Sequence, residues 1–223
     1  MSNARMNESK IWSSYNELLL SADIDRIRKL LVRYDLFQLA KNIPGDLVEC
    51  GVFKGTGFIY WLKLLAIYDP GSIKKVVGFD TFSEFANSYK PYEQKSVDAF
   101  VTEAEFSGTS KEAIMQRAED LGLTRRAELV VGDLLTTAGD YVIRNPGFRI
   151  SLLNLDVDTY EGTKVSLEKF YPVVSRGGVI VLDEYSARGW GESDAVDEFF
   201  REKAIEIKTV PFSSRPTAYL IKP

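Results

Sequence analysis

The chain has 223 residues, of which 45% are hydrophobic, and a formal net charge of −4 from 28 basic and 32 acidic side chains. That length suits one sizeable core, and the acidic balance argues against a nucleic-acid partner. The sequence contains no histidine, which excludes histidine-based triads and the commonest zinc ligand.

The first predicted element is helical. Apolar residues recur at helical spacing from residue 11 to residue 41, and Pro44-Gly45 ends the pattern. We therefore expect an N-terminal helical segment at residues 1–43, with one domain at residues 44–223. The helices of this segment are the candidate contact of a homo-oligomer.

Short β-rich runs alternate with helical patterns over the rest of the chain. The predicted strands are 47–51, 76–79, 128–131, 150–155, 179–182, 205–210 and 218–221, and the predicted helices are 56–68, 111–121, 136–143, 163–174 and 194–203. This alternation is typical of βαβ units. The connection 211–216 is too short for a helical crossover, so the last two strands should pair antiparallel. We predict an α/β, Rossmann-like fold: a mostly parallel seven-stranded sheet with helices on both faces and an antiparallel C-terminal hairpin.

One stretch, residues 83–110, breaks this alternation. It has no clean strand, and it mixes aromatic with charged side chains. Long connections without secondary structure are uncommon unless they cover a functional site. We predict a partly helical lid here, inserted after the second strand; a surface excursion without a role is the alternative.

A glycine-rich turn follows the first strand, where ligands of open α/β sheets bind. Its glycines, Gly51, Gly55 and Gly57, are spaced G-x-x-x-G-x-G and not as the dinucleotide motif G-x-G-x-x-G. An acid two residues before the first glycine, as Glu49 is here, fits the E/D-x-G pattern of methyltransferases. Tight packing of the turn is the structural alternative. The candidate cofactor-binding residues in this part of the chain are Glu49, Cys50, Gly51, Val52, Gly55 and Thr56.

Acids also follow the second and third strands. Asp80 can accept hydrogen bonds from both ribose hydroxyls of a nucleoside, and Asp133 is placed to face an adenine amino group. Each acid is also an ordinary helix cap or turn residue. The candidate cofactor-binding set therefore continues with Asp80, Thr81, Phe82, Gly132, Asp133 and Asp156.

Four acids follow the fourth and fifth strands: Asp156, Asp158, Asp183 and Glu184. If the chain stays extended, Asp156 and Asp158 project to one side, and neighbouring strands lie about 4.8 Å apart. Such crowded carboxylates bind a cation or have raised pKa values. Without histidine, oxygen ligands favour Mg²⁺, with Ca²⁺ or Mn²⁺ possible.

The acid cluster also has structural alternatives. Lys164 or Arg188 can neutralise the acids as ion pairs, and Asp158 can cap the helix that is predicted to begin near Thr163.

Taken together, these motifs resemble the macrocin O-methyltransferase (TylF-like) family of Mg²⁺-dependent sugar O-methyltransferases of antibiotic biosynthesis. The resemblance runs from residue 23 to residue 198 and rests on segments 44–55, 80–82, 132–133, 155–163, 171–185 and 194–199. It implies a class I methyltransferase fold with S-adenosylmethionine as the methyl donor. It also implies that Asp156, Asp183 and Glu184 bind the metal and that Asp158 is the general base.

The resemblance implies methyl transfer to a hydroxyl of a small molecule, a sugar moiety of a natural product or a saccharide. A catechol- or caffeoyl-CoA-type enzyme acting on an aromatic hydroxyl is the second hypothesis, because aromatic residues are frequent in the lid. A non-catalytic S-adenosylmethionine-binding protein is the third.

The lone Cys50 lies in an apolar run, and no stretch approaches the roughly 20 apolar residues that span a bilayer. We therefore expect a cytoplasmic protein without a membrane partner.

Overall fold

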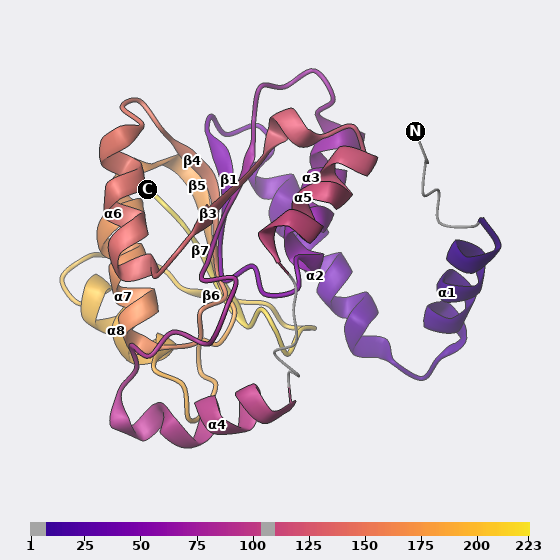
Figure 1. Cartoon of the computed structure of the whole chain (residues 1–223). Helices are drawn as coiled ribbons and strands as arrows, with labels where there is room; N and C mark the ends of the chain where they lie inside the picture. Colours follow the sequence, from indigo (N-terminus) through magenta and orange to yellow (C-terminus); the bar gives the residue numbers. More distant parts are fainter. Residues whose placement is uncertain (1–7, 104–109) are drawn as a thin grey trace.

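One mixed sheet organises the computed structural model, which describes residues 8–103 and 110–223. Within these residues its strands are β1 (Asp46–Cys50), β2 (Val76–Asp80), β3 (Ala127–Val131), β4 (Ile150–Leu155), β5 (Val174–Leu182), β6 (Lys208–Thr209) and β7 (Ala218–Ile221). Their order is β3-β2-β1-β4-β5-β7-β6. The first five strands pair parallel, and β7 pairs antiparallel with both β5 and β6. The predicted mostly parallel sheet with an antiparallel C-terminal hairpin is confirmed (Figure 1).

The central strands β1 and β4 are buried along almost their whole length, because both faces of the sheet are covered. Neighbouring residues along a strand point to opposite faces, so Leu152 and Leu153 belong to two different core clusters. The helices α2 (Ile24–Ala40), α3 (Thr56–Tyr68) and α5 (Lys111–Asp120) cover one face. The helices α6 (Leu134–Arg144), α7 (Tyr160–Phe170) and α8 (Glu192–Phe200) cover the other. Short 3₁₀ turns, η2 (Thr124–Arg126) and η3 (Tyr171–Val173), precede β3 and β5.

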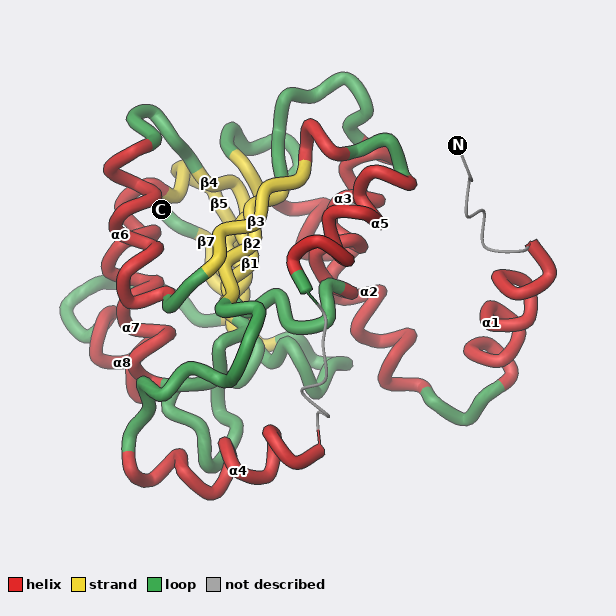
Figure 2. The backbone as a smooth tube through the Cα atoms, viewed as in Figure 1, coloured by secondary structure: helices red, strands yellow, loops and turns green. Residues whose placement is uncertain are grey.

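The N-terminal helices differ from each other in their contacts. The helix α2 begins at its N-cap Asp23, and its buried residues Leu36 and Phe37 belong to the core of the sheet. The helix α1 (Glu8–Leu20) instead extends away from the body (Figure 2). Its side chains Trp12 and Leu20 are 64% and 86% exposed. Association of two copies through these helices stays a prediction.

The predicted lid begins as a loop at residues 83–90 and continues as η1 (Pro91–Glu93) and α4 (Gln94–Glu103). We call residues 83–103 the lid segment; residues 104–109 of the prediction lie outside the described residues. In Figure 1, α4 lies beyond one end of the sheet, apart from both helical layers. Among the described residues, no helix is both long and apolar enough to cross a membrane.

Candidate functional site

A cavity of about 770 Å³ lies at the carboxyl ends of the parallel strands. The strand order reverses between β1 and β4, which is the place where open α/β sheets bind ligands. Residues that follow β1, β2, β3, β4 and β5 all contribute to its lining. The site therefore forms where the loops of five strands meet.

Four loops at this edge contain a non-glycine residue in the left-handed backbone region. These residues are Phe53, Phe82, Asp158 and Ser186, with φ between 51° and 70°. L-residues adopt this conformation at a cost, and it persists where the surroundings fix it. The loops that border the cavity are thus held in particular conformations by their neighbours.

The first glycine of the turn after β1 brings two of these loops into contact. Gly51 has a φ of +87°, and a Cβ at this position would lie 1.8 Å from the backbone oxygen of Asp156. Any other residue would force the β1 and β4 loops apart. The third glycine, Gly57, makes room for a buried side chain, because a Cβ there would lie 2.3 Å from Glu49 Oε1.

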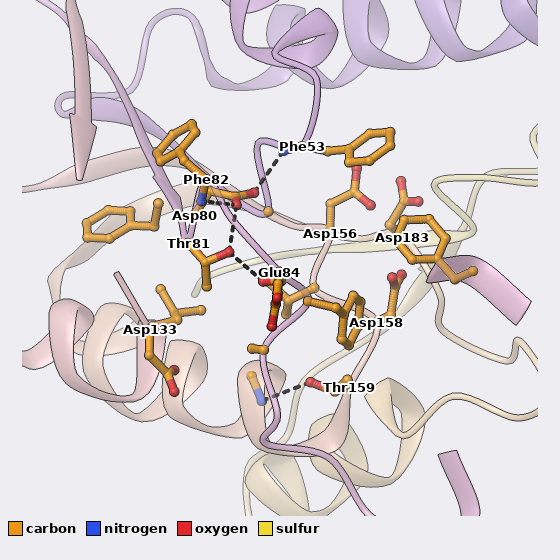
Figure 3. A pocket seen from close by; sticks show the side chains of 18 of the residues that line it. Phe53, Asp80, Thr81, Phe82, Glu84, Asp133, Asp156, Asp158, Thr159 and Asp183 are labelled. Carbon is orange, nitrogen blue, oxygen red and sulfur yellow. Dashed lines mark hydrogen bonds between the residues drawn. The ribbon is translucent and has the colours of Figure 1, made fainter. Parts of the chain in front are cut away.

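Asp80 organises the loop after β1. Its Oδ2 accepts hydrogen bonds from the backbone N–H groups of Val52 and Phe53, both at 2.8 Å, and its Oδ1 accepts one from the N–H of Phe82 at 2.9 Å. Figure 3 shows this carboxylate between Phe53 and Phe82 at the cavity. Asp133 caps α6 by accepting a hydrogen bond from the N–H of Leu135.

The structure divides the sequence-predicted residues into two groups. The cavity is lined by Gly51, Asp80, Thr81, Phe82, Gly132, Asp133, Asp156, Asp158, Asp183 and Glu184. The remaining residues, Glu49, Cys50, Val52, Gly55 and Thr56, are not part of that lining. Cys50 is fully buried in the core, and Gly55 is closely packed against Ile114 of α5. Cofactor binding by this second group stays a prediction.

Glu49 lies behind the cavity wall in a buried ion pair. Arg33 of α2 reaches both Glu49 Oε1, at 3.7 Å, and Asp156 Oδ2, at 3.5 Å. Burial raises the pKa of Glu49 to about 8, although the positive charge of Arg33 opposes this shift. The acid of the E/D-x-G pattern is therefore connected to the acid cluster through one guanidinium.

The four acids of the cluster meet on one side of the cavity. Figure 3 shows Asp156, Asp158 and Asp183 on this side, away from Asp133. Asp183 and Glu184 are 2% exposed, and Asp158 is 9% exposed. Burial and the charges of Asp156 and Glu184 raise the pKa of Asp158 well above its usual value. Burial also raises the pKa values of Asp183 and Glu184.

Basic side chains reach three of these acids. Lys29 of α2 lies 3.7 Å from Asp183 Oδ2, and Arg215 lies 2.5 Å from Glu184 Oε1. Lys164, one of the partners considered from the sequence, instead pairs with Glu198 on the surface. Asp158 is not the cap of the next helix, because Thr159 accepts the hydrogen bond of the cap from the N–H of Gly162.

The cluster has the donor chemistry of a hard-cation site but is not arranged as a closed coordination sphere. Asp183 Oδ1 and Glu184 Oε2 are buried and make no hydrogen bond within the described residues. Unpartnered buried carboxylate oxygens are costly unless a cation or proton joins them. In the described part of the chain, no three acidic, histidine or cysteine side chains stand close enough to ligate one ion as they lie. Carboxylate oxygens are the donors that hard cations prefer, and binding such an ion here would require these side chains to move.

Aromatic side chains from three segments also line the cavity. Phe100 of α4 lies 5.7 Å from Phe53, 5.8 Å from Phe85 and 6.5 Å from Trp190, measured between ring centroids. All four rings line the cavity. The lid segment thus brings an apolar surface to the site, as expected of a cover.

Sequence reasoning missed the basic residues of the site. Lys29, Arg33 and Arg215 lie far from the acids in sequence, and Arg215 follows an irregular segment. Helical spacing places Arg26, Lys29 and Arg33 close together on α2, which is the one local signal that indicates a basic face.

Comparisons with known proteins agree with this geometry. The family model of macrocin-O-methyltransferase (TylF) matches residues 24–211. Demethyldecarbamoylnovobiocin O-methyltransferase of Streptomyces niveus is 28% identical over 172 residues, which are 72% of this chain and 60% of that protein. A tetracenomycin-C 4'-O-methyltransferase of Streptomyces olivaceus, whose name includes a dimethoxy-rhamnosyl group, is 27% identical over 148 residues, 66% of this chain and 56% of that protein. The matches thus span less than two thirds of these relatives.

Solved structures show the same fold. The crystal structure of CalS11, a calicheamicin methyltransferase, matches with a TM-score of 0.76 at 24% identity, over 98% of this chain and 87% of that chain. This likeness confirms the predicted class I methyltransferase fold.

Proposed function

The chain belongs to the macrocin O-methyltransferase (TylF) family, and from this premise we propose that it transfers a methyl group from S-adenosylmethionine to a hydroxyl oxygen on a sugar moiety of a natural product. The names of its relatives support the hydroxyl acceptor, and the rhamnosyl group in one of them supports the sugar. The cavity at the strand-order reversal, lined by Gly51, Asp80 and Asp133, supports a nucleoside cofactor.

One observation carries the chemical part of the proposal. Two buried oxygens without a partner in the described residues, Asp183 Oδ1 and Glu184 Oε2, belong to a cluster that also contains Asp156 and Asp158. We infer that Asp156, Asp183 and Glu184 hold a divalent cation, with Mg²⁺ preferred over Ca²⁺ and Mn²⁺. Such a cation lowers the pKa of a hydroxyl that it contacts.

Asp158 is the candidate general base. Its carboxylate is buried, which raises its pKa and makes it a stronger base than an exposed aspartate. The aromatic rings of Phe53, Phe85 and Phe100 line the same cavity and would limit the access of water to it. Transfer from a sulfonium to oxygen is an in-line displacement, so holding the acceptor next to Asp158 supplies much of the acceleration.

A second candidate acceptor is an aromatic hydroxyl, as in catechol- or caffeoyl-CoA-type enzymes. The ring cluster around Phe100 favours it, because aromatic side chains pack well against an aromatic substrate. The sugar acceptor is preferred, because the family and the relatives named above point to it.

A paired assay separates these possibilities. The chain is incubated with methyl-labelled S-adenosylmethionine and either a deoxysugar glycoside or a catechol, in Mg²⁺ and in EDTA. The proposal predicts labelled glycoside, lost in EDTA and restored by Mg²⁺. Labelled catechol alone supports the second acceptor. Cofactor binding without transfer to members of either acceptor class supports a non-catalytic protein, and full activity in chelator contradicts the metal.

A further inference from the structure

A buried carboxylate of the lid segment joins three segments that border the cavity. Glu93, the last residue of η1, has no exposed surface. Its Oε1 accepts hydrogen bonds from the backbone N–H groups of Tyr160 at 2.9 Å and Gly191 at 2.8 Å. Its Oε2 accepts one from the N–H of Lys90. One side chain thus holds the lid turn, the start of α7 and the loop before α8.

The two distant donors are next to the acid-bearing loops. Tyr160 is two residues after Asp158 and begins α7. Gly191 precedes Glu192, a second fully buried acid, and Oε1 of Glu192 accepts a hydrogen bond from the N–H of Glu184 at 3.0 Å. Glu93 therefore accepts a hydrogen bond from the backbone beside the candidate base. It is also linked to the candidate metal ligand Glu184 through Gly191 and its neighbour Glu192.

The junction is closely packed. A Cβ on Gly191 would lie 2.6 Å from Glu93 Oε1 and 2.6 Å from Tyr160 Cβ. Asp158 has a φ of 63°, a conformation that neighbouring structure must maintain. Hydrogen bonds from N–H groups to a buried carboxylate are among the strong ones.

Two other polar attachments of the lid segment lie on the surface. Lys90 pairs with Glu161 at 2.6 Å with both side chains about one third exposed, and the exposed Tyr92 donates a hydrogen bond to Asp194. Solvent weakens such contacts. Neither contact involves the backbone around Asp158, so Glu93 differs from them in position as well as in burial.

We propose that Glu93 is a positioning residue for methyl transfer. Its hydrogen bonds hold the lid segment and the loop of Asp158 in one arrangement, so that the base is in position when the lid segment covers the cavity. This inference rests on the proposed function only in assigning the base to Asp158. The coupling between lid and loop is a property of the chain itself.

Hydrogen exchange tests the coupling without any activity measurement. In Glu93→Gln, amide protection should fall together in the lid segment, at residues 158–161 and at residues 190–192. The matched control Tyr92→Phe, on the same turn, should leave residues 158–161 and 190–192 protected as in the wild type. Loss of protection in the lid segment alone, or no loss, overturns the proposal. If Glu93→Gln does not fold, Gly191→Ala displaces the intact carboxylate and gives the same readout.

Kinetics test the consequence for the base. Glu93→Gln should lower kcat at least about tenfold through displacement of Asp158, with unchanged affinity for adenosylhomocysteine, while Tyr92→Phe keeps wild-type kcat. In an Asp158→Asn background the same substitution should cause no further loss, because both changes act on one group. A fully additive loss overturns the positioning role. If Asp158→Asn turns over like the wild type, Asp158 is not the base. The hydrogen-exchange experiment then still tests whether Glu93 couples the lid segment to the loop of Asp158.

Discussion

Arg215 donates from its Nε to Oε1 of Glu184 across 2.5 Å, although Arg215 is half exposed and Glu184 is 2% exposed. The arginine comes from the loop between β6 and β7, so the C-terminal hairpin supplies the counter-charge for an acid at the end of β5. Burial raises the pKa of Glu184, and the guanidinium opposes this shift. If Glu184 holds a divalent cation, as we propose, that cation and Arg215 are alternative partners of one carboxylate.

Arg215→Met should lower the free energy of unfolding by about 1–2 kcal/mol without divalent cations, because a buried carboxylate loses a partly solvated partner. Mg²⁺ should restore most of this loss, since a ligand that binds the folded state stabilises it. Urea unfolding with and without Mg²⁺ measures both quantities. Arg188→Met, an exposed change in the adjoining loop, is the control. An equal loss in both conditions contradicts the shared-partner account.

Asp80→Asn should weaken binding of adenosylhomocysteine about tenfold or more, because it removes a charged acceptor at the nucleoside position. It also disturbs the N–H groups of Val52 and Phe53 that this carboxylate holds. Calorimetry measures the affinity. Glu84→Gln, which changes an exposed acid of the same cavity lining, should bind like the wild type; a similar loss there indicates a general charge effect.

Asp158→Asn should reduce kcat by about 100-fold or more, because a general base contributes that much to proton removal. Affinity for adenosylhomocysteine should be retained, since the proposed nucleoside position lies with Asp80 and Asp133. Steady-state kinetics and calorimetry on the same preparation separate the two effects. Normal turnover in this variant removes Asp158 from the role of base.

Glu49 should make stability depend on pH. Its pKa rises from 4.5 to about 8 on folding, so the folded state binds a proton that the unfolded state has released. The contribution of this proton to the free energy of unfolding is fully present below pH 4.5 and is lost as the pH rises through 8. Relative to Glu49→Gln, the wild type should therefore lose on the order of 3 kcal/mol of unfolding free energy between pH 5 and pH 8. The exposed variant Glu119→Gln should follow the wild type; parallel curves for the wild type and Glu49→Gln would contradict the raised pKa.

Local patterns predicted most of the fold. The strand Ile150–Leu155 and the helix Thr56–Tyr68 have the predicted bounds, because apolar runs and helical spacing are properties of short segments. The first half of β5 was missed because Ser175, Arg176 and two glycines do not form a strand pattern. Pairing with β4 at Val174 nevertheless makes this segment part of the sheet. Of the predicted strand 205–210, only Lys208–Thr209 pairs, at the edge of the sheet.

The candidate site was predicted in part. The acids at successive strand ends could be placed because parallel strands end at one edge of a sheet, and ten of the predicted residues line one cavity. The basic partners of these acids could not be predicted, because Arg33 and Arg215 approach the acids from segments distant in the sequence. The backbone is also not extended at Asp158, where the φ of 63° turns the chain. Side-chain alternation therefore does not explain how this acid reaches the cavity.

Titration of the purified chain with Mn²⁺, followed by electron paramagnetic resonance and displaced by Mg²⁺, tests the acid cluster most directly. We predict one saturable site in the wild type. Binding should be greatly weakened in Asp183→Asn and unchanged in Asp133→Asn, which alters an acid of the same cavity outside the cluster. No saturable binding in the wild type, or equal binding in Asp183→Asn, would show that these carboxylates do not hold a divalent cation.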